Sequence, residues 1–156
     1  MADGSLVRWA QGRFEAKETA EEIELRLEQA RKESVNASGL MVRTLIGSRL
    51  DGKPHMCRGY QIETNRERLR IKCDDKPTID IMLDGSKTIY PNPRGKDLEI
   101  LAQIDGPTIT QAFESKVAGL TVIYTFSRGN LKVRKEINSE YLGKPLIIEA
   151  DYAQKR

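Results

Sequence analysis

Apolar and polar residues alternate in short segments from Tyr60 to Tyr152. The segments are separated by turn-forming residues: Asn-Arg, Asp-Asp, Asp-Gly, Pro-Arg-Gly, Asp-Gly and Arg-Gly-Asn. A strand with one buried face alternates in this way, and Gly, Asn and Asp favour the turns between antiparallel strands. The pattern predicts a mainly β protein, an up-and-down antiparallel meander that closes into a β-barrel or sandwich.

Each predicted strand has one apolar face and one mostly polar face, as the wall of a barrel requires. The strands are expected at Arg58–Glu63, Arg68–Cys73, Thr78–Leu83, Leu98–Ile104, Thr108–Ser115, Leu120–Ser127, Leu131–Ser139 and Leu146–Tyr152.

The first third of the chain predicts helices. Leu6–Trp9 is expected to be a short first strand or the entry to the barrel. Thr19 and Glu22 have the spacing of a helix capping box, and apolar residues then recur at helical spacing: Ala20, Ile23, Leu27 and Ala30. A second helix is expected over Leu40–Leu50. The two helices form a lid or plug at one end of the sheet, or cover an open face of it.

The length of 156 residues predicts one domain over 1–156, with a helical segment at about 18–50 and a strand meander at about 57–153. The net charge of +3 is spread along the chain, which argues against nucleic-acid binding.

We expect no membrane span. The first residues do not resemble a signal peptide, which leaves two alternatives: a cytoplasmic protein, or a periplasmic or secreted one whose signal was removed. The oligomeric state stays open.

Cys57 and Cys73 flank a predicted hairpin, and its register decides whether they can meet. A register that pairs the two cysteines sets Gly59 opposite Ile71, which mismatches the apolar faces. A shift by one residue pairs Tyr60 with Ile71, which matches the apolar faces around an Asn65-Arg66 turn and puts the cysteines on opposite sides of the sheet. We therefore expect free thiols, with a bulge at Gly59 as the alternative that would permit a disulfide.

No catalytic motif accompanies the strands. His55 is the only histidine, and no Gly-x-Ser-x-Gly elbow, glycine-rich phosphate loop, Cys-x-x-Cys pair or His-Glu-x-x-His motif is present. The sequence thus predicts no catalytic residue, metal site or cofactor, and it favours a binding protein over an enzyme without deciding between them.

Four polar residues lie on otherwise apolar strand faces: Gln111, Tyr124, Lys135 and Tyr152. A buried ammonium needs a carboxylate, an anion or water as a partner, so Lys135 either faces inward with a partner or lies at a bulge or near the rim. Buried Tyr hydroxyls also require hydrogen-bond partners. These residues could orient a ligand or complete a core.

Several segments together resemble the lipocalin-like proteins of bacteria: 83–87, 92–95, 98–106, 108–113, Leu131-Lys132-Val133 and the turn containing Gly143-Lys144-Pro145. Trp9 ahead of a helical segment is placed similarly to the Trp near the N-terminus of that family. The resemblance implies a calycin-type barrel, usually exported in such bacteria, that binds a small hydrophobic molecule.

Two departures from that pattern concern the ligand. The usual Gly-x-Trp is here Val7-Arg8-Trp9, without the glycine. Fatty-acid-binding relatives carry an Arg-x-Tyr carboxylate clamp on the last strand, where this chain has Ala150-Asp151-Tyr152. Because the arginine is missing, the sequence does not predict binding of a free fatty acid.

Three functions are compatible with the sequence. The leading hypothesis is a small hydrophobic ligand inside the barrel, with contacts from Trp9, Gln111, Phe113, Tyr124, Phe126, Lys135 and Tyr152. The second is a structural or interaction protein whose barrel is filled by its own side chains. An outward apolar patch is then either a partner or self-association surface or is covered by the helices: Met82, Leu101, Ile123 and Ile147. The third is a barrel enzyme, such as a cyclase acting mainly by substrate shape.

Overall fold

The computed structural model describes residues 4–36, 56–74, 78–90, 98–114, 119–138 and 144–155. The helix expected at Leu40–Leu50 and the position of His55 lie outside these residues, as does the side chain of Phe113.

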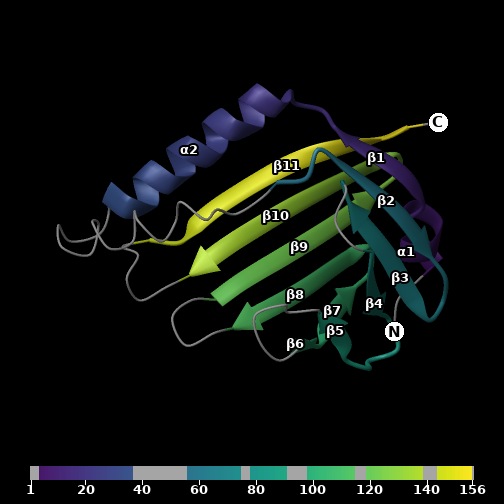
Figure 1. Cartoon of the computed structure of the whole chain (residues 1–156). Coiled ribbons are helices and arrows are strands. Elements are labelled where there is room, and N and C mark those ends of the chain that lie inside the picture. Colours follow the sequence, from purple (N-terminus) through teal and green to yellow (C-terminus); the bar gives the residue numbers. More distant parts are fainter. Residues whose placement is uncertain are drawn as a thin grey trace.

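Two helices and eleven strands occupy the described residues (Figure 1). They are α1 (Gly4–Trp9), β1 (Gly12–Ala16), α2 (Ala20–Asn36), β2 (Gly59–Thr64), β3 (Arg68–Cys73), β4 (Ile79–Met82), β5 (Thr88–Tyr90), β6 (Leu98–Ile100), β7 (Ala102–Asp105), β8 (Thr108–Glu114), β9 (Gly119–Ser127), β10 (Asn130–Asn138) and β11 (Leu146–Lys155).

Nine of the strands form one antiparallel sheet in the order β4-β3-β2-β1-β11-β10-β9-β8-β7. The first strand pairs with the last, and the sheet curls so that β2 and β3 cross in front of β8–β10 (Figure 1). The predicted antiparallel barrel is confirmed in a nearly closed form, with β4 and β7 at the two edges. The expected strand Leu98–Ile104 is divided at Leu101: β6 pairs with β5, and β7 pairs with β8.

The expectation of a strand at Leu6–Trp9 is wrong, because this segment forms helix α1. Leu6 and Ala10 are both fully buried, and the Ala10 N–H donates to the Leu6 carbonyl at 2.9 Å. Residues four apart share a helix face, so burial of this pair favours a helical turn. Gln11 and Ala10 then hydrogen-bond Thr64, which fixes α1 beside the last residue of β2.

The helix predicted from the capping box is confirmed as α2. The Thr19 hydroxyl accepts a hydrogen bond from the Glu22 N–H at 3.2 Å, which satisfies one of the free donors at the start of the helix. Ile23 is buried, and Leu27 packs against the same core cluster. The helix runs alongside β11 (Figure 1), and its later turns reach Lys144, which pairs with Glu33 at 3.8 Å. The outer apolar residues are not all covered, since Leu101 is 55% and Ile147 is 39% exposed.

The hairpin of β2 and β3 has a different register from the one expected. Tyr60 pairs with Cys73 rather than with Ile71, because the turn is centred one residue later. Asn65 Oδ1 accepts the N–H groups of Glu67 and Arg68 at 2.8 and 2.9 Å, which holds the chain in that turn. This shift keeps the apolar faces matched, since it changes the pairing by two positions.

Candidate functional site

The barrel interior has two differently packed ends, defined by the strand termini. At the floor end, α1 lies beside Thr64, and inward side chains such as Phe126 and Leu131 are 1% exposed. At the mouth end, where β1 ends and β2 begins, the inward residues Leu120 and Ile137 are only half-buried. The inward residues are thus closely packed at the floor, whereas at the mouth they range from buried, such as Leu146 at 1% exposed, to half-buried.

Aromatic rings bridge opposite walls of the interior. Tyr60 on β2 contacts Tyr124 on β9 and Tyr152 on β11 edge to face, with ring centroids 6.2 and 5.0 Å apart. Nearer the floor, Phe14 and Phe126 make a similar contact at 6.0 Å. Rings at these separations are in packing contact, so side chains fill the barrel at these levels.

One layer nearer the mouth, a row of inward residues crosses five neighbouring strands. The register aligns Gln111 with Ala102 on one side and Val122 on the other, and Val122 in turn with Lys135 and Ile148. Parity thus places Gln111 and Lys135 on the interior face; for Lys135 the sequence left this open beside a bulge or a position near the rim. Neighbouring strands lie about 4.8 Å apart, which sets the two polar residues roughly 10 Å apart across the row.

Gln111 is fully buried, and neither its Nε2 nor its Oε1 has a hydrogen-bond partner among the residues that the structure describes. Leaving a buried amide unpaired costs about 1–3 kcal/mol. A group in this position is normally satisfied by protein, water or ligand. Among the described interior residues, Gln111 is therefore the one whose buried polar atoms lack hydrogen-bond partners.

Lys135 is half-buried in the mouth half of the barrel. The pairing of β10 is continuous on both sides through this position, so the bulge considered from the sequence is not present. The other explanation, a position near the rim, agrees with the partial exposure of Lys135 and with the end of β10 at Asn138. Its ammonium adds a positive charge at the mouth.

Tyr152 is fully buried, and its hydroxyl donates to the carbonyl oxygen of Cys57. Burial raises its pKa, and burial, followed by the neighbouring hydroxyls of Tyr124 and Tyr152, raises the pKa of Tyr60 well above the usual value. Both phenols are therefore neutral hydrogen-bonding groups at ordinary pH.

These two tyrosines predict a loss of stability at alkaline pH. An unfolded tyrosine has a pKa near 10, whereas the folded pKa of Tyr60 and Tyr152 is higher. Their contribution is fully present below about pH 10 and decreases above it, by about 1.4 kcal/mol per pH unit for each tyrosine, until the folded pKa is passed. Urea unfolding from about pH 9 to about pH 11 should show this decrease, and Tyr60→Phe should reduce the slope. An unchanged slope in Tyr60→Phe would contradict the assignment.

The remaining sequence candidates lie at different levels of the barrel. Trp9 is half-buried in α1 and packs against the core at the floor end. Phe113 is in β8, two residues beyond Gln111 toward the mouth. The structure therefore brings Gln111, Lys135 and Tyr124 near one another in adjacent rows, while Trp9 and Phe126 belong to the floor.

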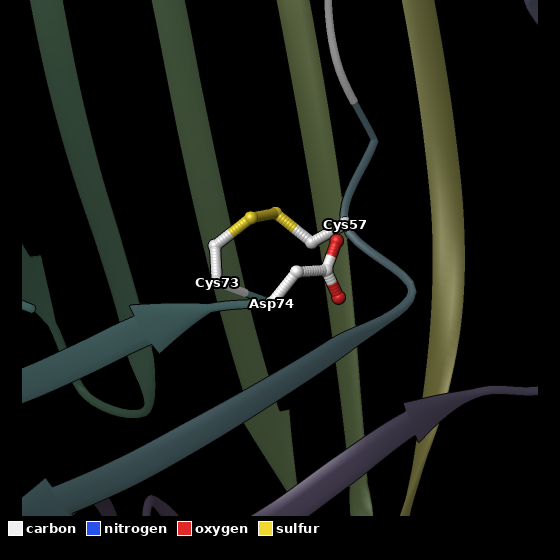
Figure 2. A group of neighbouring side chains, drawn as sticks. All are labelled: Cys57, Cys73 and Asp74. Carbon is white, nitrogen blue, oxygen red and sulfur yellow. A yellow bond between two sulfur atoms is a disulfide. The ribbon is translucent and has the colours of Figure 1, made fainter. Parts of the chain in front are cut away.

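A corner of the mouth holds a feature that the sequence prediction missed (Figure 2). Cys57 and Cys73 form a disulfide with a Cα–Cα distance of 5.6 Å, so the expectation of free thiols is wrong. The parity argument assumed that β2 extends to Cys57, but β2 begins at Gly59. The Asp74 carboxylate accepts the N–H groups of Arg58 and Gly59, which turns the preceding residue toward Cys73.

The structure also contains an open cleft of about 760 Å³ at the outer face of the first strands. Its lining includes outward-facing charged side chains: Arg13, Glu15, Arg58 and Lys72. A mixed charged surface of this kind is unsuited to an apolar ligand, for which pockets are mostly hydrophobic. The interior remains the candidate site.

Comparisons with known proteins agree with the architecture. No protein-family model and no curated protein matches the chain. Among solved structures, it is similar to the apo crystal structure of lipid binding protein 8 of Caenorhabditis elegans, with a TM-score of 0.55, 10% identity and 99% of each chain covered. At this identity the likeness shows the fold alone, a nearly closed antiparallel β-barrel. No helix in the described segments is long and apolar enough to cross a bilayer.

Proposed function

We propose that the protein binds a small hydrophobic molecule in the mouth half of its barrel and pairs one polar group of that molecule with Gln111. The unpartnered, fully buried amide of Gln111 is the observation that carries the proposal. Its Nε2 can donate and its Oε1 can accept, so a hydroxyl, amide or carbonyl group is a suitable partner. Val122 and Ile148, which are buried in the same row, supply apolar contacts.

Two comparisons support this choice of function. The structural neighbour is named a lipid binding protein, and its barrel has the same architecture. The resemblance of the sequence to bacterial lipocalin-like proteins points to the same class of ligand. The Arg-x-Tyr clamp remains incomplete, since Ala150 occupies the arginine position and the Tyr152 hydroxyl donates to Cys57. A ligand with a neutral polar group therefore fits better than a free fatty acid.

In this proposal the candidate contacts fall into two groups, apart from Tyr152, whose hydroxyl donates to the Cys57 carbonyl. Gln111, Tyr124, Lys135 and Phe113 belong to the mouth half and are the proposed ligand contacts. Phe126 and Trp9 support the floor beneath them. A barrel filled by side chains, acting through its surface, is the second candidate, and the aromatic contacts of Tyr60 favour it.

We expect Gln111→Leu to stabilise the ligand-free protein by about 1–3 kcal/mol, because it removes an unpaired buried amide. The same change should weaken binding of Nile red, a neutral apolar dye with a carbonyl group, about tenfold, since the dye loses its polar partner. Urea unfolding and dye fluorescence measure the two effects. Native mass spectrometry of protein from its producing cells should show a retained small molecule that the variant loses.

Gln103→Leu is the matched control, because Gln103 is exposed on the neighbouring strand β7. It should leave both stability and dye binding nearly unchanged. Unchanged dye binding in Gln111→Leu would reject Gln111 as the anchor. A bare wild-type protein that also fails to bind Nile red would favour the filled barrel.

A further inference from the structure

The disulfide corner at the mouth is held together by more than its covalent bond (Figure 2). Asp74 accepts the N–H of Gly59 at 2.9 Å and the N–H of Arg58 at 3.1 Å. The Asp74 N–H donates to the Gly59 carbonyl at 3.0 Å, and the Ala16 N–H donates to the Arg58 carbonyl at 2.8 Å. These contacts do not involve sulfur, so they keep the two cysteines adjacent when the disulfide is reduced.

The three side chains at this corner offer metal-binding atoms close together. One Sγ each from Cys57 and Cys73 and one carboxylate oxygen of Asp74 all lie within 4.8 Å of one another. A tetrahedral ion with Zn–S bonds of about 2.3 Å and Zn–O bonds of about 2.0–2.2 Å separates its ligand atoms by roughly 3.5–3.8 Å. Small side-chain movements therefore suffice to bring the three atoms around one ion.

We propose that reduction of the Cys57–Cys73 disulfide creates a binding site for a thiophilic divalent cation such as Zn²⁺. The two thiolates and the Asp74 carboxylate are the protein ligands, and water occupies the fourth position. Two thiolates give this site its preference for a soft or borderline ion, and three protein ligands leave the fourth position of a tetrahedral ion open.

The chemistry balances in two steps. A dithiol or phosphine reductant supplies two electrons to the S–S bond; the bond breaks, two protons are taken up, and the reductant is oxidised. The cation then displaces the proton from each thiol, so that binding releases two protons and forms two metal–sulfur bonds. The backbone N–H groups that bind Asp74 remain in place, as hydrogen bonds to a ligating carboxylate commonly do.

The unequal exposure of the three side chains allows an ion to reach the site from one side. Cys57 is 2% exposed, whereas Cys73 and Asp74 are half-buried. The ion would thus enter past Cys73 and Asp74, and it would link the segment before β2 to the end of β3 as the disulfide does. This inference concerns the mouth corner alone and does not depend on a ligand in the barrel.

Co²⁺ titration of the full chain, reduced with a phosphine under anaerobic conditions, tests the proposal. We expect a thiolate-to-cobalt charge-transfer band that saturates at one equivalent and disappears when Zn²⁺ is added. The oxidised protein should show no band. A reduced protein whose two thiols react with Ellman's reagent but which gives no band would overturn the proposal.

Asp74→Asn is the informative variant, because the amide oxygen can still accept the N–H groups of Arg58 and Gly59 while the charged ligand is lost. It should keep both thiols and weaken Co²⁺ binding about tenfold or more. Asp105→Asn, at an exposed carboxylate on β7, should bind Co²⁺ as the wild type does. An unchanged band in Cys73→Ser or unchanged affinity in Asp74→Asn would place the ion elsewhere and reject this site.

Discussion

Replacing Phe126 by alanine should destabilise the protein by about 3–5 kcal/mol, the cost of a large aromatic deletion in a packed core. Phe126 is 1% exposed, and its ring contacts that of Phe14 at the floor end. The neighbouring side chains of the packed core relax only partly into the space that the ring leaves, which adds to the cost. Urea unfolding of the variant and the wild type measures the difference.

The same variant also tests where the ligand lies. If the ligand occupies only the mouth half, Phe126→Ala should bind Nile red nearly as tightly as the wild type. The comparison is made without urea, where both proteins are folded. Thr125→Ala is the control: its half-buried side chain points outward from the same strand and should change stability by about 0.5 kcal/mol or less. Loss of dye binding in a folded Phe126→Ala protein would extend the site to the floor.

The strands were predictable from the sequence because inward parity is a local property. Ile109 and Gln111, or Val122 and Tyr124, face inward whatever the partner strand is, since side chains alternate along any strand. The N-cap of α2 was also predictable, because Thr19 and Glu22 are three residues apart. By contrast, the few residues around Leu6 were too short a segment to distinguish a helical period from an alternating one.

The features that failed prediction depend on contacts between distant residues. Alternation continues through Leu101, so the sequence does not show that β6 and β7 change partners there. The disulfide depends on where β2 begins, and that is decided by hydrogen bonds from Arg58 and Gly59 to Asp74 across the hairpin. Gln111 was predictable as an inward polar residue, but its lack of a partner required the packing around it.

Removing the disulfide should destabilise the protein by about 3 kcal/mol while leaving the folded mouth corner almost unchanged. The two cysteines are 16 residues apart, and a crosslink over a loop of this length acts mainly by restricting the unfolded chain. Urea unfolding of a Cys57→Ala, Cys73→Ala double variant measures the loss. Hydrogen exchange at the amides of Arg58 and Gly59 reports the native corner.

The two measurements together distinguish two roles of the disulfide. It either crosslinks a corner that Asp74 already holds in place, or it is itself the bond that positions Cys57. Retained protection of Gly59 with reduced global stability would show that Asp74 holds the two segments without the sulfur bond, which the metal site requires. Loss of that protection would mean that the disulfide itself positions Cys57, and reduced thiols would then separate rather than enclose an ion. In that case the Tyr152 hydroxyl would also lose its acceptor at Cys57, and stability would fall further by about 1–3 kcal/mol.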